Sequence, residues 1–317
     1  MRLTNLLKLW YVKSMRALVS GGAGFIGSRL ALELEKNGAE VHVIDSFLSL
    51  NFNNLSLFKG PVIQHDLLDD WTSSGKWDVI FHQAAITDPR HESDEEVYEK
   101  NVRGFEKLLK LALQSQAKLI YASTAGLYGN GAVPMKEAQE KEVLTAYGRS
   151  KLKMDEIAES HFNQLHLVGL RYFNVFGPHE AHKGRPASMI YHLWKQMVSG
   201  QRPRLFKWGE QSRDFIYVKD VVRANLCAIH APSGIYNVGT GVASTFNTVV
   251  RILNEVLGTS LEPDYFDMPY ESKTYQHCTL ADTSYAETGL NFKTEWDLKS
   301  AIFDYVKWLE KTEGSHL

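Results

Sequence analysis

A glycine-rich run near the start of the chain joins a strand-like segment to a helical one. Residues 21–27 (GGAGFIG) follow the apolar segment 16–20 and precede a helical pattern over residues 28–37. Glycines between a strand and a helix permit a tight turn and a close approach to a pyrophosphate, which rests on the N-terminus of the helix. The run therefore predicts a Rossmann-type unit that binds a dinucleotide, whereas its structural alternative is a flexible loop.

The rest of the first half alternates short apolar runs with helical patterns. The apolar runs lie at residues 41–44, 62–65, 79–82 and 119–122. This alternation predicts an α/β fold, a doubly wound parallel sheet with helices on both faces.

The pattern weakens from Asn174 onward, where glycine, proline and basic residues become denser. We predict a Rossmann-type domain over residues 15–173 and a smaller, mainly substrate-binding domain over residues 174–317. The apolar segments 214–218 and 235–238 predict that the chain returns to the sheet near residues 214–240.

The composition argues against several classes of function. With 317 residues, 44% of them hydrophobic, and a net charge of −2, the chain resembles a soluble globular protein without affinity for nucleic acid. Cys227 and Cys278 are too few for a disulfide framework and lack metal-ligand spacing, so we expect no metal and a cytoplasmic location. Residues 1–14 contain no apolar run long enough for a signal peptide or a membrane span, and Met15 is a plausible start of the native protein.

A second motif supplies a candidate acid or base. Tyr147 and Lys151 are spaced i, i+4, so on a helix they share one face, and the ammonium can favour the ionised phenol. Such a pair arises often by chance in amphipathic helices, and it gains weight here from the glycine run. Together the two motifs predict redox chemistry on a bound nicotinamide.

Polar and small residues follow the other predicted strands, where ligands bind in sheets of this class. Asp45 ends the second strand about 20 residues beyond the glycines, the position that binds ribose hydroxyls, although a turn aspartate is the alternative. Asp66 is a candidate for the adenine edge, and the small residues after Gln83 let the backbone approach the cofactor. Ser123 and Thr124 are placed to meet a substrate hydroxyl, or else to cap a turn.

The chain resembles the extended short-chain dehydrogenase/reductase family of nucleotide-sugar epimerases and dehydratases. The resemblance lies in the glycine run, in the Tyr147–Lys151 pair and in the polar residues that follow the strands. It extends to Asn101 and to residues 171–178 (RYFNVFGP) and 213–215 (RDF). The resemblance covers nearly the whole chain after residue 15. It implies that Thr124, Tyr147 and Lys151 act in catalysis. The cofactor-binding residues that it implies are Gly21, Gly24, Phe25, Ile26, Gly27, Asp45, Ser46, Asp66, Gln83, Ala84, Ala85, Asn101, Lys151 and Val175.

Within that family the chain is similar to the heptose 6-epimerases, which act on ADP-glycero-manno-heptose in lipopolysaccharide biosynthesis. The similarity lies in residues 180–184 (EAHKG), in residues 187–188 (AS) and in His192. It implies that Lys183 is a second base beside Tyr147, whereas a lone loop lysine is usually solvated. Arg213 also fits on physical grounds, because a guanidinium matches a diphosphate in a bidentate manner. The substrate-binding residues implied are Ser123, Asn174, Arg185, His192, Phe206, Arg213 and Tyr275.

Two departures from the family pattern affect the expected ligands. Residues 45–51 (DSFLSLN) contain no basic residue to hold a 2′-phosphate, and an unpaired acid repels that phosphate, so NAD is favoured over NADP. Arg185 stands where the resemblance implies Ser, which affects the details of the substrate. We expect a nucleotide-diphosphate sugar such as ADP-heptose as substrate, no membrane partner, and a homo-oligomer, which is common for such enzymes.

The implied mechanism is a transient oxidation. The oxidised nicotinamide takes a hydride from a carbinol carbon and returns it to the other face, while Tyr147 and Lys183 exchange protons from opposite sides. Thr124 is expected to hydrogen-bond the reacting oxygen. Lys151 is expected to hold the nicotinamide ribose and to lower the pKa of Tyr147.

Three other functions stay open on the sequence alone. A UDP-sugar 4-epimerase shares most of these motifs but can work with one Tyr and a rotating ketone, so Lys183 discriminates against it. A 4,6-dehydratase needs an acid pair next to Thr124, where this chain has Ala125 and Gly126. A non-catalytic nucleotide-sugar or dinucleotide sensor has no need of an activated phenol.

Overall fold

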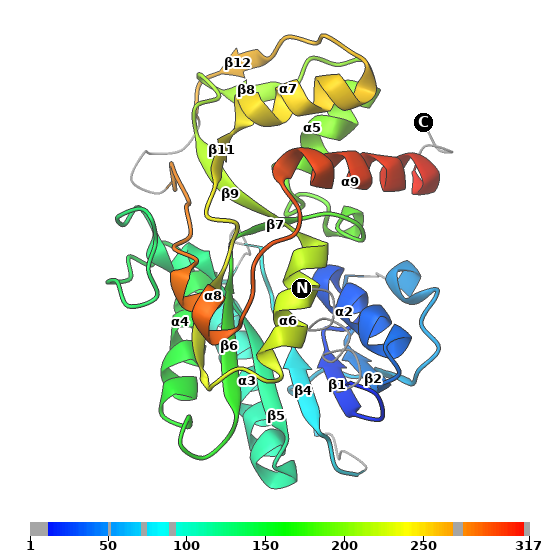
Figure 1. The fold of residues 1–317 in the computed structure, drawn as a ribbon, viewed down its shortest axis with the longest axis vertical. Helices are drawn as coiled ribbons and strands as arrows, with labels where there is room; N and C mark the ends of the chain where they lie inside the picture. The colour runs from blue at the N-terminus through cyan, green and yellow to red at the C-terminus, as the bar shows by residue number, and fades with distance from the viewer. Residues whose placement is uncertain (1–11, 50–51, 71–74, 89–92, 269–274, 314–317) are drawn as a thin grey trace.

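Seven parallel strands form the central sheet of the protein, in the order β10-β6-β5-β4-β1-β2-β3 (Figure 1). The computed structural model describes residues 12–49, 52–70, 75–88, 93–268 and 275–313. The strands are β1 (Arg16–Ser20), β2 (Glu40–Asp45), β3 (Val62–Gln64), β4 (Val79–His82), β5 (Lys118–Thr124), β6 (Leu167–Tyr172) and β10 (Gly234–Val238). The predicted strands of the first half are confirmed, with ends that differ by one or two residues.

Helices cover both faces of this sheet, which confirms the predicted doubly wound class. Successive strand residues point to opposite faces, so Leu119 and Ile120 enter two different apolar cores. The core around Ile120 is closed by helices α2 and α6, and the core around Leu119 by α3 and α4. These helices are α2 (Phe25–Lys36), α3 (Asp94–Ser115), α4 (Ala146–Glu159) and α6 (Val218–Ala228).

A smaller part of the molecule lies beyond the carboxyl end of the central sheet, at the top of Figure 1. It contains a three-stranded sheet in the order β11-β9-β7 and a two-stranded sheet of β12 and β8. Its helices close a third apolar core around Trp194, Leu253 and Tyr305. The elements are β7 (Asn174–Phe176), α5 (Met189–Val198), β8 (Arg204–Phe206), β9 (Ser212–Tyr217), β11 (Ala243–Thr245), α7 (Phe246–Leu257), β12 (Asp264–Phe266) and α9 (Leu298–Thr312).

The predicted return of the chain to the central sheet is half right. Segment 235–238 lies in β10, at the edge of that sheet, as predicted. Segment 214–218 forms a strand, but this strand, β9, pairs with β7 and β11 in the small sheet, so the prediction that it joins the central sheet is wrong. An apolar run predicts a strand without specifying its partners, and β7 already leads the chain out of the large sheet. The domain boundary at residue 174 stays a prediction.

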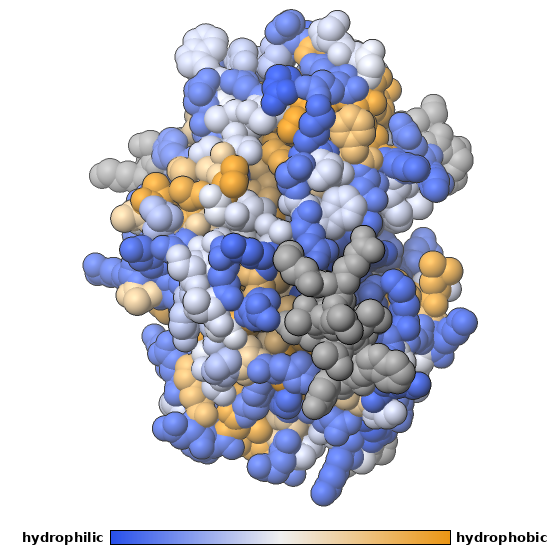
Figure 2. All heavy atoms as spheres, viewed as in Figure 1, coloured by the Kyte–Doolittle hydropathy of each residue, from blue (hydrophilic) through white to orange (hydrophobic). Residues whose placement is uncertain are grey.

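Among the described residues, no helix is both long and apolar enough to cross a membrane. On the face drawn in Figure 2, hydrophilic side chains cover most of the surface and hydrophobic ones form separate small patches. Residues 1–11, on which the choice of Met15 as a start partly depends, lie outside the described residues, as do Leu50 and Asn51 of the predicted cofactor-selecting loop.

Candidate active site

The glycine run forms the predicted turn between β1 and α2. Gly21 has a φ of +65°, and a Cβ added to it would lie 2.5 Å from the backbone nitrogen of Ala84. A Cβ on Gly27 would lie 2.1 Å from the carbonyl oxygen of Gly21. Helix α2 starts at Phe25, and its N-cap residue, Gly24, makes no side-chain capping bond. The turn is thus a tight cradle against the loop after β4, with helix N–H groups left for a ligand.

We expect Gly27→Ala to weaken dinucleotide binding, because the added methyl must push the turn open. Overpacking of this kind costs about 1–3 kcal/mol, which corresponds to about a tenfold to a hundredfold rise in Kd. Isothermal titration with NAD measures the effect. Gly104→Ala is the matched control, because its Cβ would meet Leu67 at an ordinary 3.7 Å. Equal affinity of the Gly27 variant and the wild type would contradict the assignment of the turn.

Asp45 lies at this turn, as predicted. One carboxylate oxygen accepts a hydrogen bond of 3.0 Å from the backbone N–H of Ala23, and the other accepts one of 2.8 Å from Phe47. Asp45 is therefore a turn aspartate, the structural alternative given above, and it also lies beside the glycine cradle, where a ribose-binding acid is expected. Ser46 follows it, half-buried, and Asp66 accepts a bond of 2.9 Å from Leu68 at the end of β3. Contacts of these side chains with a cofactor stay predictions.

Asn101 holds the loop that follows β4. Its side-chain oxygen accepts a bond of 2.8 Å from the N–H of Ile86, and its amide donates to Ile86 O at 3.1 Å and to Ser150 Oγ at 3.1 Å. Gln83 in the same loop donates to Asn225 Oδ1 at 3.1 Å and accepts from Tyr172 at 3.2 Å. The loop with Ala84 and Ala85 is thereby fixed against the glycine turn.

Tyr147, Lys151 and Thr124 come together at the carboxyl end of β5. Helix α4 begins just before Tyr147 because Thr145 caps it, accepting a bond of 3.0 Å from the N–H of Gly148. The Lys151 ammonium lies 5.7 Å from the centre of the Tyr147 ring, so the two share a helix face as predicted. Thr124 meets the Tyr147 side chain and also caps the turn that follows β5.

Burial dominates the electrostatics of this cluster. It raises the pKa of Tyr147 to about 12, and a hydrogen bond with Thr124 acts in the opposite direction. Burial also lowers the pKa of Lys151 to about 8, while the charge of Asp155 acts to raise it. Burial sets the direction of the shift for Tyr147, and a lowering of its pKa by Lys151 stays a prediction. Both groups are desolvated, and the ammonium lies 5.7 Å from the centre of the Tyr147 ring.

A buried ion pair between Arg171 and Asp155, which was not predicted from the sequence, lies next to this cluster. Arg171 donates to Asp155 at 2.9 Å, and Tyr121 donates to the other carboxylate oxygen of Asp155 at 2.9 Å. Ser123 is 1% exposed and lies beside Asp155, so the structure places it under the cluster rather than in the open beside Thr124. The spacing of Asp155, four residues after Lys151, was the available sequence signal.

Lys183 lies on the loop that follows β7, in the short helix η3 (Ala181–Lys183). It is half-buried, and its ammonium lies 5.6 Å from the ring centre of Phe25, the first residue of α2. Burial lowers its pKa, and the carboxylate of Glu180 opposes this shift. A solvated loop lysine would show neither feature. The structure thus brings Lys183 to the start of α2, beside the glycine turn.

The same loop is tied to the turn by polar contacts. Asn54 donates to Ala23 O at 3.0 Å, and its amide lies 3.1 Å from Nδ1 of His182. Ser28 Oγ lies 2.9 Å from Nδ1 of His179. These contacts fix the position of the Lys183 loop relative to α2.

Three predicted substrate residues gather in the smaller part of the molecule. The Arg213 guanidinium donates to the carbonyl oxygens of Ser212 at 2.9 Å and His277 at 3.1 Å, and it lies 5.1 Å from the Tyr275 ring centre. The Phe206 ring centre lies 5.8 Å from that of Tyr275. No carboxylate pairs with Arg213 in the described parts of the chain, which suits a residue that binds an anion.

The remaining predicted substrate residues lie in β7, in α5 and in the loop between them. Asn174 in β7 accepts a bond of 2.8 Å from Thr279, and Val175 follows it, half-buried. His192 lies at the start of α5, where its ring Nε2 is 3.2 Å from the carbonyl oxygen of Arg185. Arg185 itself is exposed.

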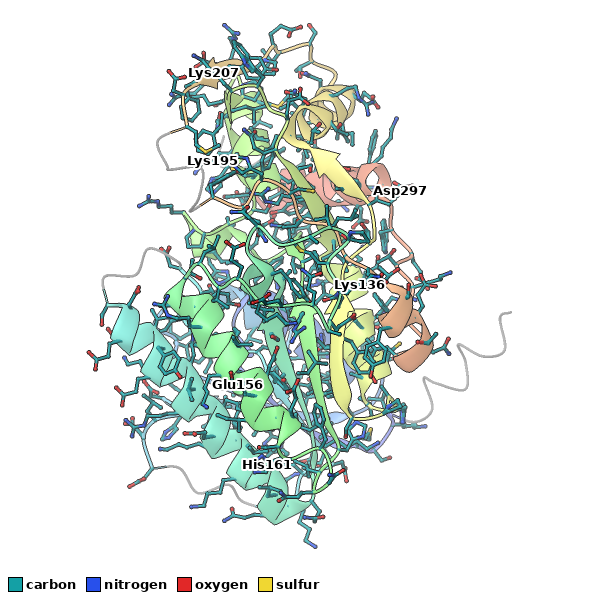
Figure 3. The ribbon with its side chains drawn as sticks, turned by 90° about the vertical axis from the view of Figure 1, so that its left-hand side faces the viewer. Lys136, Glu156, His161, Lys195, Lys207 and Asp297 are labelled. Carbon is teal, nitrogen blue, oxygen red and sulfur yellow. The ribbon has the colours of Figure 1, made fainter. Side chains whose placement is uncertain are left out.

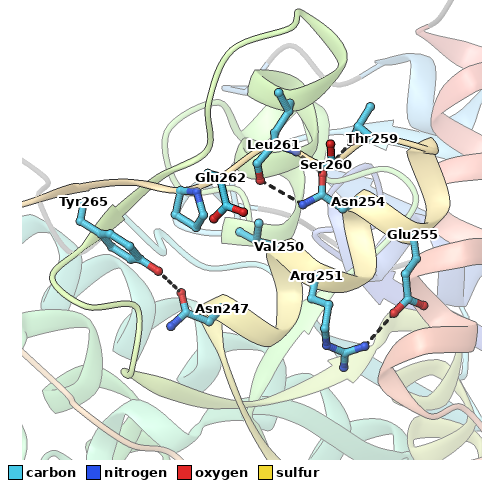
Figure 4. A pocket seen from close by; sticks show the side chains of 11 residues that line it. Asn247, Val250, Arg251, Asn254, Glu255, Thr259, Ser260, Leu261, Glu262 and Tyr265 are labelled. Atoms are coloured by element: carbon cyan, nitrogen blue, oxygen red, sulfur yellow. Dashed lines mark hydrogen bonds and ion pairs between the residues drawn. The ribbon is translucent and has the colours of Figure 1, made fainter.

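A surface cleft of ≈ 460 Å³ lies away from these residues (Figure 4). It is formed by one side of α7 and the segment that follows it, and its side chains are largely bonded to one another, as Asn247 is to Tyr265 at 2.9 Å. None of the predicted site residues lines it. The candidate site is therefore the set of residues at the carboxyl end of the sheet.

Comparisons with known proteins agree on one family. The model of the "NAD dependent epimerase/dehydratase family" matches residues 17–239. ADP-L-glycero-D-manno-heptose-6-epimerase of Brachyspira hyodysenteriae is 33% identical, over 94% of this chain and 98% of that protein. The crystal structure of the enzyme of that name from Helicobacter pylori has a TM-score of 0.88 and 38% identity, and covers 94% of this chain and 97% of its own. A UDP-glucuronic acid 4-epimerase from Bacillus cereus, in complex with UDP-glucuronic acid and NAD, has a TM-score of 0.81 and 27% identity, over 93% and 100%.

Proposed function

The chain belongs to the NAD dependent epimerase/dehydratase family, and on this basis we propose that it interconverts the two 6-epimers of ADP-glycero-manno-heptose. The observation that carries the choice of substrate is the placement of Lys183. It is a second titratable group beside the cofactor-binding turn, half-buried against Phe25, on a different element from Tyr147. The identity of 33–38% to heptose 6-epimerases over 94% of the chain supports the same assignment.

The residues present fit a dinucleotide. The cradle at Gly21 and Gly27 has no room for a Cβ, and the N-terminus of α2 is not capped by a side chain. The Lys151 ammonium is fully buried and has no hydrogen-bond partner among the described residues, so it has donors free for the ribose of the nicotinamide half. Asp45, bonded to Ala23 in the glycine turn, is proposed to bind the adenosine ribose.

We propose that the protein prefers NAD to NADP, because Asp45 is the acid at the ribose position and the described part of its loop holds no basic residue. A 2′-phosphate would meet a carboxylate without a cation between them. We expect NAD to bind at least about tenfold more tightly, a difference of about 1.4 kcal/mol, and Asp45→Ser to reduce the preference. Titration of both dinucleotides into the wild type and the variant measures it. Tighter binding of NADP by the wild type would contradict this proposal.

In this proposal Tyr147 and Lys183 each carry out one of the two proton transfers. A dinucleotide held by the glycine turn and Lys151 would supply reversible hydride transfer at carbon 6 of the heptose. With its pKa at about 12, Tyr147 carries its proton at neutral pH and can donate it to a ketone oxygen. Lys183, whose pKa is lowered by burial, can take the proton of the hydroxyl as a neutral amine. One turnover leaves the two groups in the opposite protonation states, which the reverse reaction requires.

Thr124 and Arg213 orient the substrate in this proposal. Thr124 sits against the Tyr147 side chain and can hold the reacting oxygen at the phenol. Arg213 binds the diphosphate, with Phe206 and Tyr275 beside it for the nucleotide. Arg185 and His192 are proposed to contact the sugar from the Lys183 side.

A UDP-sugar 4-epimerase is the second candidate, favoured by the structural similarity to the 4-epimerase of Bacillus cereus. The two functions are separated by incubating the protein with ADP-D-glycero-D-manno-heptose and, in parallel, with UDP-galactose. Our proposal expects conversion of the first and not of the second. Interconversion of UDP-galactose and UDP-glucose alone would assign the protein to the 4-epimerases and remove the catalytic role of Lys183.

We propose two further properties of the protein, its location and its oligomeric state. A cytoplasmic location fits a chain with two cysteines, Cys227 and Cys278, that form no disulfide in the described structure, because disulfides are rare there. A homo-oligomer is expected from the general habit of such enzymes, and light scattering tests it.

A further inference from the structure

Glu180 is the most buried carboxylate of the Lys183 loop, and the mechanism above does not use it. Its side chain is 0% exposed. Burying a carboxylate without hydrogen bonds or an opposite charge costs folding free energy, so the groups around Glu180 indicate its role. Three hydrogen bonds to its carboxylate come from the two ends of the loop.

The carboxylate joins the beginning of the loop to its end. One oxygen accepts bonds from the N–H of Gly177 at 3.0 Å and from Ser188 Oγ at 2.9 Å, and the other accepts a bond of 2.6 Å from the N–H of Ser188. Gly177 follows β7, and Ser188 is the N-cap of α5. The segment that carries Lys183 is thus closed into a ring by one side chain.

The charge of Glu180 acts on Lys183 as well. Burial lowers the pKa of Lys183, and the Glu180 carboxylate is the group that opposes this shift. Burial raises the pKa of Glu180, and its hydrogen bonds and the Lys183 ammonium oppose the rise. The two groups therefore stabilise each other's charged forms in a site that water does not solvate fully.

Other charged or titratable groups also face this pair. His182, on the same loop, has a lowered pKa because it is buried and lies near Lys183. Tyr191 of α5 and Tyr305 of α9 lie near Glu180, and burial raises the pKa of each. All three are uncharged at neutral pH, so Glu180 is the acid that Lys183 meets on this loop. Arg29 of α2 and Glu313 act on the neighbours His179 and Tyr305.

From these contacts we propose that Glu180 is a positioning residue for the reaction: its carboxylate closes the loop that carries Lys183 and places a buried negative charge on it. This inference rests on the proposed role of Lys183 as the second base. Glu180 does not touch the substrate. It acts by fixing where Lys183 lies and how readily Lys183 gives up its proton.

The test is a titration of Lys183 in protein labelled with ¹³C-lysine, followed by NMR, with Lys183→Met to assign the signal. In Glu180→Gln the pKa of Lys183 is expected to fall by about one to three units, the usual effect of an opposite charge at close range. Glu156→Gln is the matched control, because this residue of α4, labelled in Figure 3, is exposed and pairs with Lys153 at 3.2 Å on the surface, away from the Lys183 loop. The control is expected to leave the titration unchanged.

Turnover gives a second readout. In the direction in which Lys183 is the base, the pH profile of Glu180→Gln is expected to shift toward acid by the same amount as the NMR titration. Glu180→Asp keeps the charge and shortens the side chain. If Glu180→Gln does not fold, Glu180→Asp is expected to lower turnover and to shift Lys183 less.

The outcomes separate the two proposals. An unchanged Lys183 titration in a folded Glu180→Gln, or unchanged turnover in Glu180→Asp where that is the variant that folds, overturns the positioning role. A shifted titration in a protein that epimerises no heptose leaves the role of Glu180 intact and refutes the proposed function.

Discussion

Tyr147→Phe is expected to abolish epimerisation while leaving the dinucleotide bound. The variant removes the phenol proton that Tyr147 carries at neutral pH, since its pKa is about 12, and it leaves Lys151 and the glycine cradle in place. General acid–base catalysis contributes about 10²–10⁴-fold, and we expect a loss at the upper end of this range. Kinetics of the epimerisation and titration with NAD measure the two effects separately.

The matched control for this variant is Tyr98→Phe, at a tyrosine of α3 that is 38% exposed. It makes the same chemical change on the surface and is expected to have wild-type turnover. Substantial activity of Tyr147→Phe would show that another group transfers the proton. Loss of activity together with loss of NAD binding would point to a structural role of the hydroxyl instead.

Lys183→Met is expected to lower turnover by about 10²-fold or more, because it removes the second proton-transferring group. Methionine keeps the length of the side chain and its contact with Phe25, so the loop is expected to stay in place. Its kcat is the quantity to compare, with thermal unfolding to check the fold. Since the variant has no second base at all, raising the pH is not expected to restore activity.

Lys195→Met provides the comparison for Lys183→Met. Lys195 is an exposed lysine of α5, labelled in Figure 3, and the same substitution there is expected to leave turnover unchanged. If both variants retain turnover, Lys183 is not a base in the reaction, and a mechanism with Tyr147 alone, as in a 4-epimerase, becomes the better account.

The sequence predicts the large sheet well because its signals are local. The glycine run and the alternation of apolar segments with helical patterns depend on neighbouring residues, and β1 and α2 form where these patterns place them. The sheet to which segment 214–218 belongs depends instead on distant partners, β7 and β11, that no periodicity identifies. The prediction failed at the point where pairing, not propensity, decides the structure.

The site shows the same division. Spacing alone placed Tyr147 and Lys151 on one face of α4, but the pKa of Tyr147 depends on burial, which a motif does not contain. Asp155 and Glu180 were missed because buried acids are read as ordinary helix or loop residues. Both nevertheless stand close in sequence to a catalytic candidate, four residues after Lys151 and three before Lys183.

The central claim is that the protein inverts carbon 6 by removing a hydride and returning it to the same carbon. The most direct test is NMR of ADP-D-glycero-D-manno-heptose incubated with the purified protein in D₂O, without added reductant. We predict that the two 6-epimers approach one equilibrium ratio from either side and that the hydrogen on carbon 6 stays protium. Absence of conversion, or deuterium at carbon 6 in the product, would contradict the account.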